Sequence, residues 1–191
     1  MHLLGTAIIA TTVLATLTVG FFALSKRLSA LRDPLSVWYV VHGLDLLPIR
    51  MRSWIYSTVV GFANPYSRSI NFRITEVEKG KVCGAMKETK SVSNPFRSVH
   101  AGALVTFGET VGGLAVFTYL GKKDRAILTN INAEYIKVAR GCLTASSIVP
   151  DFTNTDTKHE KDVVTEVIIM NASFDTVAKL TLTWRVDLRT E

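Results

Sequence analysis

The chain has 191 residues and a formal net charge of +6, from 22 Lys and Arg against 16 Asp and Glu. Five basic residues cluster after the first apolar run, and the others alternate with acidic ones; the five are Lys26, Arg27, Arg32, Arg50 and Arg52. This pattern suits a membrane-surface flank better than a nucleic-acid stripe, and no basic residues are interleaved with aromatic side chains as in single-strand binders. Its two cysteines, Cys83 and Cys142, are too few and too far apart for a disulfide framework or a zinc site, so we expect buried free thiols and no bound metal.

The first 25 residues contain no Asp, Glu, Lys or Arg. Residues 3–24 are long enough to cross a bilayer, for which about 20 residues are needed, and Lys26 and Arg27 follow them. A cleavable signal would place positive charge before a shorter apolar core, so residues 1–25 are predicted to be an uncleaved anchor. The positive-inside rule then places the main domain in the cytoplasm or the mitochondrial matrix, with the mitochondrial inner membrane as one candidate location.

Small residues form a stripe along this anchor, where Thr12, Thr16 and Gly20 repeat every four residues. Such a stripe permits close contact between helices in lipid, so it is a candidate surface for other membrane subunits. An anchor of ordinary composition is the simpler alternative.

Within the segment 26–63, residues 34–63 are apolar but interrupted by Pro and Gly. They carry aromatic side chains of the kind found at membrane interfaces, together with Arg50 and Arg52. This composition favours one or two short amphipathic helices that lie on membrane lipids or cap the domain.

Residues 64–191 have the pattern of one folded domain. Ile70, Phe72 and Ile74 alternate with polar residues and predict a half-buried strand, which a turn joins to a second strand at 82–88. An apolar helix is predicted next, beginning after the turn Ser93-Asn94-Pro95 and ending near Leu120.

Four further strands are predicted at 126–137, 142–149, 163–170 and 178–188. Ile127, Thr129 and Ile131 are expected on one face of the first, and the continuous apolar run at 163–170 predicts a strand buried on both faces. The last strand alternates between apolar and polar residues. One long helix among about six antiparallel strands predicts an α+β domain whose sheet wraps around the helix, the hotdog arrangement.

Glu109 lies within the apolar helix, beside Phe107 and Val111, and no Lys or Arg occurs in the ten residues after it. A carboxylate in such surroundings is costly to bury unless it is paired, hydrogen-bonded or functional. We therefore take Glu109 as the centre of the candidate site; a structural carboxylate bonded to a partner's backbone is the alternative.

Three pieces of this domain resemble hotdog-fold acyl-CoA thioesterases, in particular the branch of phenylacetyl-CoA thioesterases and a related domain family of unassigned function. They are Asn94 with the run VHAGAL at 99–104, Glu109 followed by Gly112-Gly113, and the run NAEYIKVARG at 132–141. The resemblance covers roughly residues 60–189.

The resemblance implies roles for four residues. Glu109 would be the general base or the nucleophile toward the thioester, and Gly102 would offer a helix N-terminal N–H to the oxyanion. His100 would shape this loop or touch the thioester carbonyl, and Asn94 would orient water or the carbonyl. The structural alternatives are that His100 only begins the helix and that Asn94 is only a turn residue.

Lys137 and Arg140, at the end of a predicted strand, are candidates for binding the phosphates of coenzyme A. A solvated strand end is the alternative for both. No cofactor is implied beyond acyl-CoA itself as substrate or ligand.

His100 and Glu109 are nine residues apart, which corresponds to about 180° around a helix and roughly 13 Å along it. One chain cannot easily bring them into one pocket, so a site shared by two chains of a homodimer or tetramer is expected. The leading hypothesis is a membrane-anchored thioesterase that hydrolyses a fatty or aryl acyl-CoA at a dimer interface. The alternatives are a non-catalytic structural subunit of a membrane complex, attached through the Thr12/Thr16/Gly20 stripe, and an acyl-CoA-binding module without turnover.

Overall fold

The structure is a computed structural model that describes residues 33–153 and 160–189. The predicted anchor at residues 1–25, with its small-residue stripe, lies outside the described residues. Within the described ranges, no helix is both long enough and apolar enough to cross a membrane.

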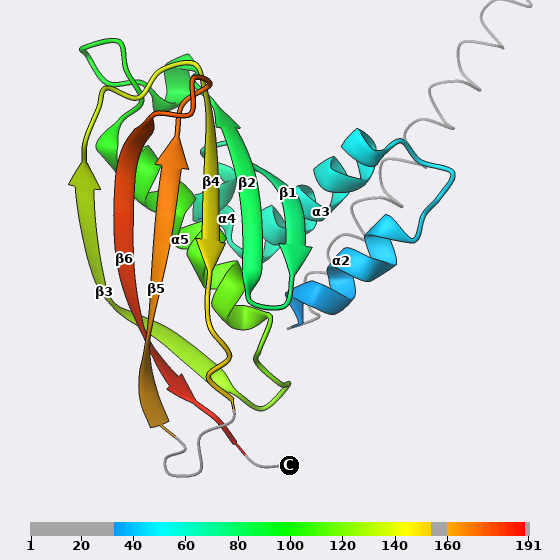
Figure 1. The fold of residues 1–191 in the computed structure, drawn as a ribbon. Helices are drawn as coiled ribbons and strands as arrows, with labels where there is room; N and C mark the ends of the chain where they lie inside the picture. Colours follow the sequence, from blue (N-terminus) through cyan, green and yellow to red (C-terminus); the bar gives the residue numbers. More distant parts are fainter. Residues whose placement is uncertain (1–32, 154–159, 190–191) are drawn as a thin grey trace, which may run out of the picture.

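Three helices precede the sheet: α2 (Pro34–His42), α3 (Ile49–Ala63) and the short α4 (Pro65–Arg68). Asp33 begins α2 by accepting a hydrogen bond from the Leu35 N–H at 2.9 Å, and Pro34 supplies a first residue that needs no N–H partner. α2 and α3 form a hairpin that projects from one side of the sheet domain (Figure 1).

One antiparallel sheet of six strands forms the body of the domain. Its strands are β1 (Arg73–Glu78), β2 (Lys81–Lys87), β3 (Arg125–Tyr135), β4 (Cys142–Ile148), β5 (Glu160–Met170) and β6 (Thr176–Asp187). They pair in the order β1-β2-β4-β5-β6-β3. A single-turn η1 (Lys90–Val92) leads from β2 toward the long helix.

The helix α5 (Ala101–Phe117) packs along one face of this sheet, which curves around it (Figure 1). The approach is close because two glycines one turn apart face the strands. A Cβ at Gly112 would lie 2.6 Å from Leu182 Cδ1 and 2.8 Å from Val167 Cγ2, and a Cβ at Gly108 would lie 2.6 Å from Leu180 Cδ2. A six-stranded antiparallel sheet around one long helix confirms the predicted α+β arrangement.

Two predictions about strand faces are wrong. A bulge between Leu128 and Asn130 shifts the register of β3 against β6, so Ile127 and Ile131 fall on opposite faces. In β5 buried and exposed residues alternate, and Val164 is 54% exposed, so this strand has one solvent face. The alternation predicted for the last strand is confirmed in β6, where Leu180, Leu182 and the other residues of that phase are buried.

The N-terminal hairpin shares its core with the sheet domain. Val41, Tyr56 and Val59 are buried in the same hydrophobic cluster as α5 and the strands. The buried Ser57 Oγ accepts a hydrogen bond from the Ile74 N–H of β1 at 2.8 Å, which fixes α3 against the edge of the sheet.

The two cysteines differ from the expectation in their burial. Both are free, as predicted, but Cys83 is half-buried and Cys142 is exposed. Cys142 begins β4, where its side chain points to the solvent face of the sheet, opposite to the buried Leu143.

Candidate active site

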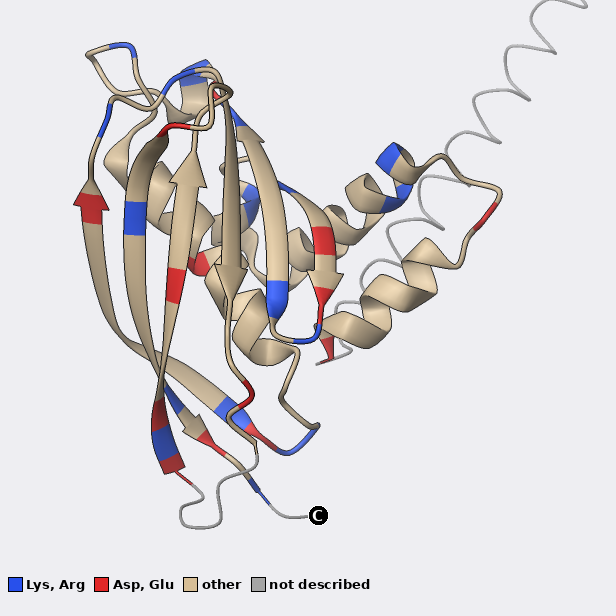
Figure 2. Ribbon diagram, in the orientation of Figure 1, with Lys and Arg blue, Asp and Glu red and all other residues tan. Residues whose placement is uncertain are grey.

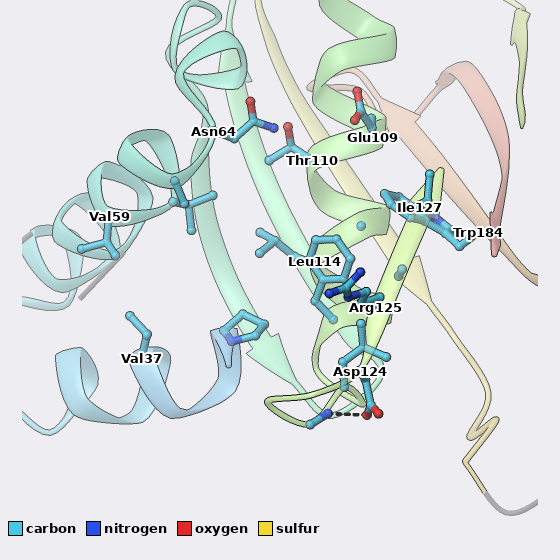
Figure 3. A pocket seen from close by; sticks show the side chains of 18 of the residues that line it. Val37, Val59, Asn64, Glu109, Thr110, Leu114, Asp124, Arg125, Ile127 and Trp184 are labelled. Atoms are coloured by element: carbon cyan, nitrogen blue, oxygen red, sulfur yellow. Dashed lines mark hydrogen bonds between the residues drawn. The ribbon is translucent and has the colours of Figure 1, made fainter. Parts of the chain in front are cut away.

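The candidate site is a cavity of about 620 Å³ between the N-terminal hairpin, the outer side of α5 and the start of β3. Val37 of α2 and Val59 of α3 line one wall, Leu114 of α5 lies at its centre, and Ile127 of β3 closes the other side (Figure 3). Trp184 of β6 also lines the cavity, with its ring against Gly113 of α5. Most of the lining is apolar, as in sites that bind small apolar ligands.

Glu109 supplies the carboxylate of this cavity. It is half-buried, and it is the only charged residue of α5, which Figure 2 shows as one red band on an otherwise uncharged helix. Burial raises the pKa of the Glu109 carboxyl above its ordinary value. No salt bridge reaches this carboxyl from any described residue, so its proton affinity is set by the apolar wall.

Two neutral polar side chains lie at the same end of the cavity as Glu109. Thr110 and Asn64 line it there (Figure 3). The Thr110 hydroxyl contacts the Thr106 carbonyl at 2.7 Å and the Ser67 hydroxyl at 2.9 Å, while Asn64 Oδ1 accepts from the Ser67 N–H at 3.3 Å. These bonds join α4 to α5 and fix the rim beside the carboxylate.

The opposite end of the cavity lies where α5 is followed by β3. One Asp124 carboxylate oxygen accepts from the Gly121 N–H of the local turn at 2.7 Å, and the other accepts from the Arg189 N–H beyond β6 at 2.8 Å. Arg125 is exposed beside it. Charged groups therefore mark both ends of the cavity, and its middle is apolar.

Asn94, His100 and Gly102 do not line this cavity in the single chain. Asn94 Oδ1 accepts from the Phe96 N–H at 3.0 Å and the Ser98 N–H at 3.2 Å, which is the bonding of a turn residue. His100 Nδ1 accepts from the Gly102 N–H at 2.9 Å and so caps α5.

Because α5 is unbroken from Ala101 to Phe117, His100 and Glu109 stay apart as their spacing predicts. One chain does not bring together the residues to which the resemblance assigns a common site.

Lys137 and Arg140 lie in the exposed link between β3 and β4, away from the cavity lining. Lys137 Nζ forms a salt bridge with Asp175 Oδ1 at 2.8 Å, and the Lys137 ammonium lowers the pKa of the Asp175 carboxyl. Their proposed contact with coenzyme A phosphates stays a prediction.

Sequence reasoning missed the wall that faces Glu109. Tyr56, Val59, Val60 and Ala63 recur at spacings of three and four residues in α3, and all line the cavity. That spacing marks one face of a helix, so the sequence did contain a signal that α3 turns an apolar face toward the domain.

Residues 52–186 match the model of a family described as "Domain of unknown function (DUF4442)". A Vibrio cholerae protein described as "Putative esterase" is 26% identical over 87 residues, which is 46% of this chain and 58% of that protein. The chain thus spans little more than half the length of this curated relative.

Several solved structures share the fold. A probable thioesterase of Pseudomonas aeruginosa superposes with a TM-score of 0.64 at 17% identity, covering 75% of this chain and 97% of that one. A thioesterase of Staphylococcus aureus gives a TM-score of 0.58 at 22% identity, with coverage of 65% and 99%. A hypothetical thioesterase of Streptococcus pneumoniae with coenzyme A gives 0.55 at 21% identity, with coverage of 66% and 96%.

Proposed function

Because the chain belongs to the family described as the domain of unknown function DUF4442, and because its fold is that of thioesterases, we propose that it hydrolyses acyl-CoA thioesters. One observation carries the proposal. The central helix presents a half-buried carboxylate, Glu109, whose pKa is raised by burial, at one end of an apolar cavity of about 620 Å³.

The chemistry assigned to Glu109 is that of a general base. Its carboxylate takes a proton from water while the water oxygen attacks the thioester carbonyl carbon, and the bond from that carbon to sulfur then breaks. The acid and the coenzyme A thiol are released, and the proton held by Glu109 passes to the departing sulfur. A base is most effective when its pKa lies near the working pH, which is the direction in which burial shifts Glu109.

The oxyanion that forms on the carbonyl needs hydrogen-bond donors. We assign this role to the N-terminal end of α5, with Gly102 as the donor. In the single chain the Gly102 N–H donates to His100 Nδ1, so this donor would have to exchange the imidazole for the thioester oxygen.

Two chains are required to join these parts. The site that we propose pairs Glu109 of one chain with the loop carrying Asn94, His100 and Gly102 of a second chain. The separation along α5 supports this arrangement, because within one chain the loop stands at the start of the helix and Glu109 lies nine residues after His100.

A non-catalytic role as a structural subunit of a membrane complex is the second candidate. The observation that favours it is the local bonding of Asn94 and His100, each of which is fully explained by a turn and a helix cap. This candidate predicts a stable fold without turnover.

We further propose that the domain works against a membrane surface through the tip of the α2–α3 hairpin. Five apolar side chains of this tip are between 45% and 100% exposed: Leu44, Leu46, Ile49, Met51 and Trp54. An exposed apolar patch of this kind marks a contact surface. Arg50 lies among them, and the uncharged stretch at residues 3–24 precedes the hairpin, which supports a lipid surface as the partner.

The thioesterase proposal is tested by release of free thiol from acyl-CoA by the purified full-length chain in mild detergent. Turnover that is saturable in acyl-CoA supports it. Absence of turnover across fatty and aryl acyl groups, in a preparation that melts cooperatively, would favour the structural subunit instead.

A further inference from the structure

The cavity is elongated along α5. Glu109, Gly113 and Phe117 follow one another at intervals of one helical turn, and all three line it. At 1.5 Å per residue this face extends for about 12 Å beyond the carboxylate. Figure 3 shows Glu109, Thr110 and Asn64 at one end, Asp124 and Arg125 at the other, and Leu114 between them.

The wall opposite α5 comes from the hairpin of the same chain. It is built by apolar residues of α3 and by two residues of α2: Tyr56, Val59, Val60, Ala63, Pro34 and Val37. The family match begins at residue 52, so α2 lies before the matched region. Part of this wall is therefore formed by residues outside the matched region.

Contacts within the hairpin hold this wall in place. The Tyr56 hydroxyl donates to the Pro34 carbonyl at 3.1 Å, and the Tyr56 ring meets Trp38 edge-on with 5.0 Å between centroids. Arg52 closes the connecting loop by donating to the carbonyl oxygens of His42 at 2.6 Å and Leu47 at 2.8 Å. A wall fixed in this way can discriminate between ligands by their length.

We infer that this elongated cavity, called the slot from here on, binds a straight fatty acyl chain, with the thioester carbonyl at Glu109 and the tail between α3 and α5. The α2–α3 hairpin then limits the length of the acyl chain. The inference rests on the proposed thioesterase function and narrows its substrate class. A compact aryl acyl group would occupy the first turn beyond Glu109 and leave the apolar surface near Phe117 uncovered. A linear acyl chain would cover the apolar lining along its whole length from Glu109 to Phe117.

The first test compares kcat/KM of the full-length chain for butyryl-, octanoyl-, palmitoyl- and phenylacetyl-CoA. Burial of one methylene corresponds to about a fourfold gain, so octanoyl-CoA is expected to exceed butyryl-CoA at least about tenfold. Octanoyl-CoA is also expected to exceed phenylacetyl-CoA. Equal values for butyryl- and octanoyl-CoA, or a preference for phenylacetyl-CoA, would overturn the inference while leaving thioesterase activity established.

The second test narrows the slot from the wall formed by α3. Val60 is half-buried and lines the cavity, so Val60→Phe should lower the octanoyl-to-butyryl ratio at least about tenfold, by excluding roughly two or more methylenes at about fourfold each. Val40→Phe is the matched control, because Val40 is 56% exposed on α2 and outside the lining. Equal octanoyl-to-butyryl ratios in Val60→Phe and Val40→Phe would contradict the assignment of α3 as a wall of the slot.

Leu120→Ala removes a half-buried side chain at the far end of the slot and should shift the preferred chain toward palmitoyl-CoA. This variant keeps the inference testable if Val60→Phe does not fold. An unchanged profile in Leu120→Ala would count against the inference.

Binding separates failure of the inference from failure of the proposed function. If no thioester is hydrolysed, the proposed activity is wrong, and the slot is then tested with thioether analogues of octanoyl- and phenylacetyl-CoA by thermal shift. A larger increase in Tm with the octyl analogue, lost in Val60→Phe and kept in Val40→Phe, would support the slot. An equal or smaller increase than with the aryl analogue would refute it.

Discussion

Glu109 is the residue at which, under the proposed mechanism, stability and activity oppose one another. Its carboxyl lies against apolar side chains without a counter-charge from the described residues, so its charged form is disfavoured and its pKa is raised. For the general base that we propose, this shift is toward the working pH, and it comes at a cost in folding stability when the group is ionised.

The cost has a definite dependence on pH. With the pKa raised above its ordinary value of 4.5, the folded state keeps a proton that the unfolded chain has already released. The free energy of unfolding therefore falls as the pH rises through this range. Glu109→Gln removes the effect, so its Tm should exceed that of the wild type at neutral pH and the two should converge below about pH 4.

Differential scanning calorimetry at a series of pH values measures this difference. Glu166→Gln, on the exposed face of β5, provides the control and should follow the wild type. A Glu109→Gln variant that is less stable than the wild type at neutral pH would mean that the carboxylate has a favourable partner.

At the level of elements, the position of α3 depends on Ser57. Its hydroxyl donates to the Ser53 carbonyl at 2.7 Å and accepts from the buried Ile74 N–H at 2.8 Å. Ser57→Ala leaves that N–H without an acceptor and should lower the free energy of unfolding by about 1–3 kcal/mol in urea denaturation.

Thr58→Ala is the matched control for this prediction. The Thr58 hydroxyl makes the same bond to the carbonyl four residues earlier, that of Trp54 at 2.8 Å, but on the exposed side of the helix. The decrease in the free energy of unfolding in Thr58→Ala should therefore be near zero. Equal losses for the two variants would show that Ser57 acts within the helix and not by attaching α3 to β1.

The elements also show how far sequence patterns reach. The alternation in β6 predicted its buried face because one strict period of two runs through that strand. The bulge near Thr129 was not predicted, because the extra residue is inserted without any Gly or Pro in the sequence to mark it. Glu109 was singled out because a lone carboxylate stands out in an apolar helix. The spacing of apolar residues in α3 marks a buried face, but it does not say which segment that face contacts, because the contact is formed between segments distant in the sequence.

At the scale of the whole molecule, the tip of the hairpin is expected to enter a lipid surface. In vesicles that contain brominated lipids, the fluorescence of the full-length chain should be quenched through Trp54, which is 45% exposed at the tip. Trp54→Phe should lose most of this quenching. Trp38→Phe, which alters a half-buried ring stacked on His42, should retain it, and quenching that depends equally on both would contradict the proposed orientation.

Association of two chains can be tested by complementation. Glu109→Gln and His100→Ala should each be inactive alone if one site uses Glu109 of one chain and His100 of the other. Mixed after dissociation and reassembly, they should recover about one quarter of wild-type turnover, since half of the dimers are mixed and each mixed dimer has one intact site. No recovery, with exchange confirmed by native mass, would place the site within one chain.

The measurement that bears most directly on the account is thioester turnover in Glu109→Gln. Turnover of octanoyl-CoA should fall at least about 100-fold, the range typical for loss of a general base, while Glu166→Gln retains wild-type turnover. The circular dichroism and melting of both variants establish that they are folded. Unchanged turnover in a folded Glu109→Gln variant would contradict the assignment of the base and, with it, the site at the centre of this fold.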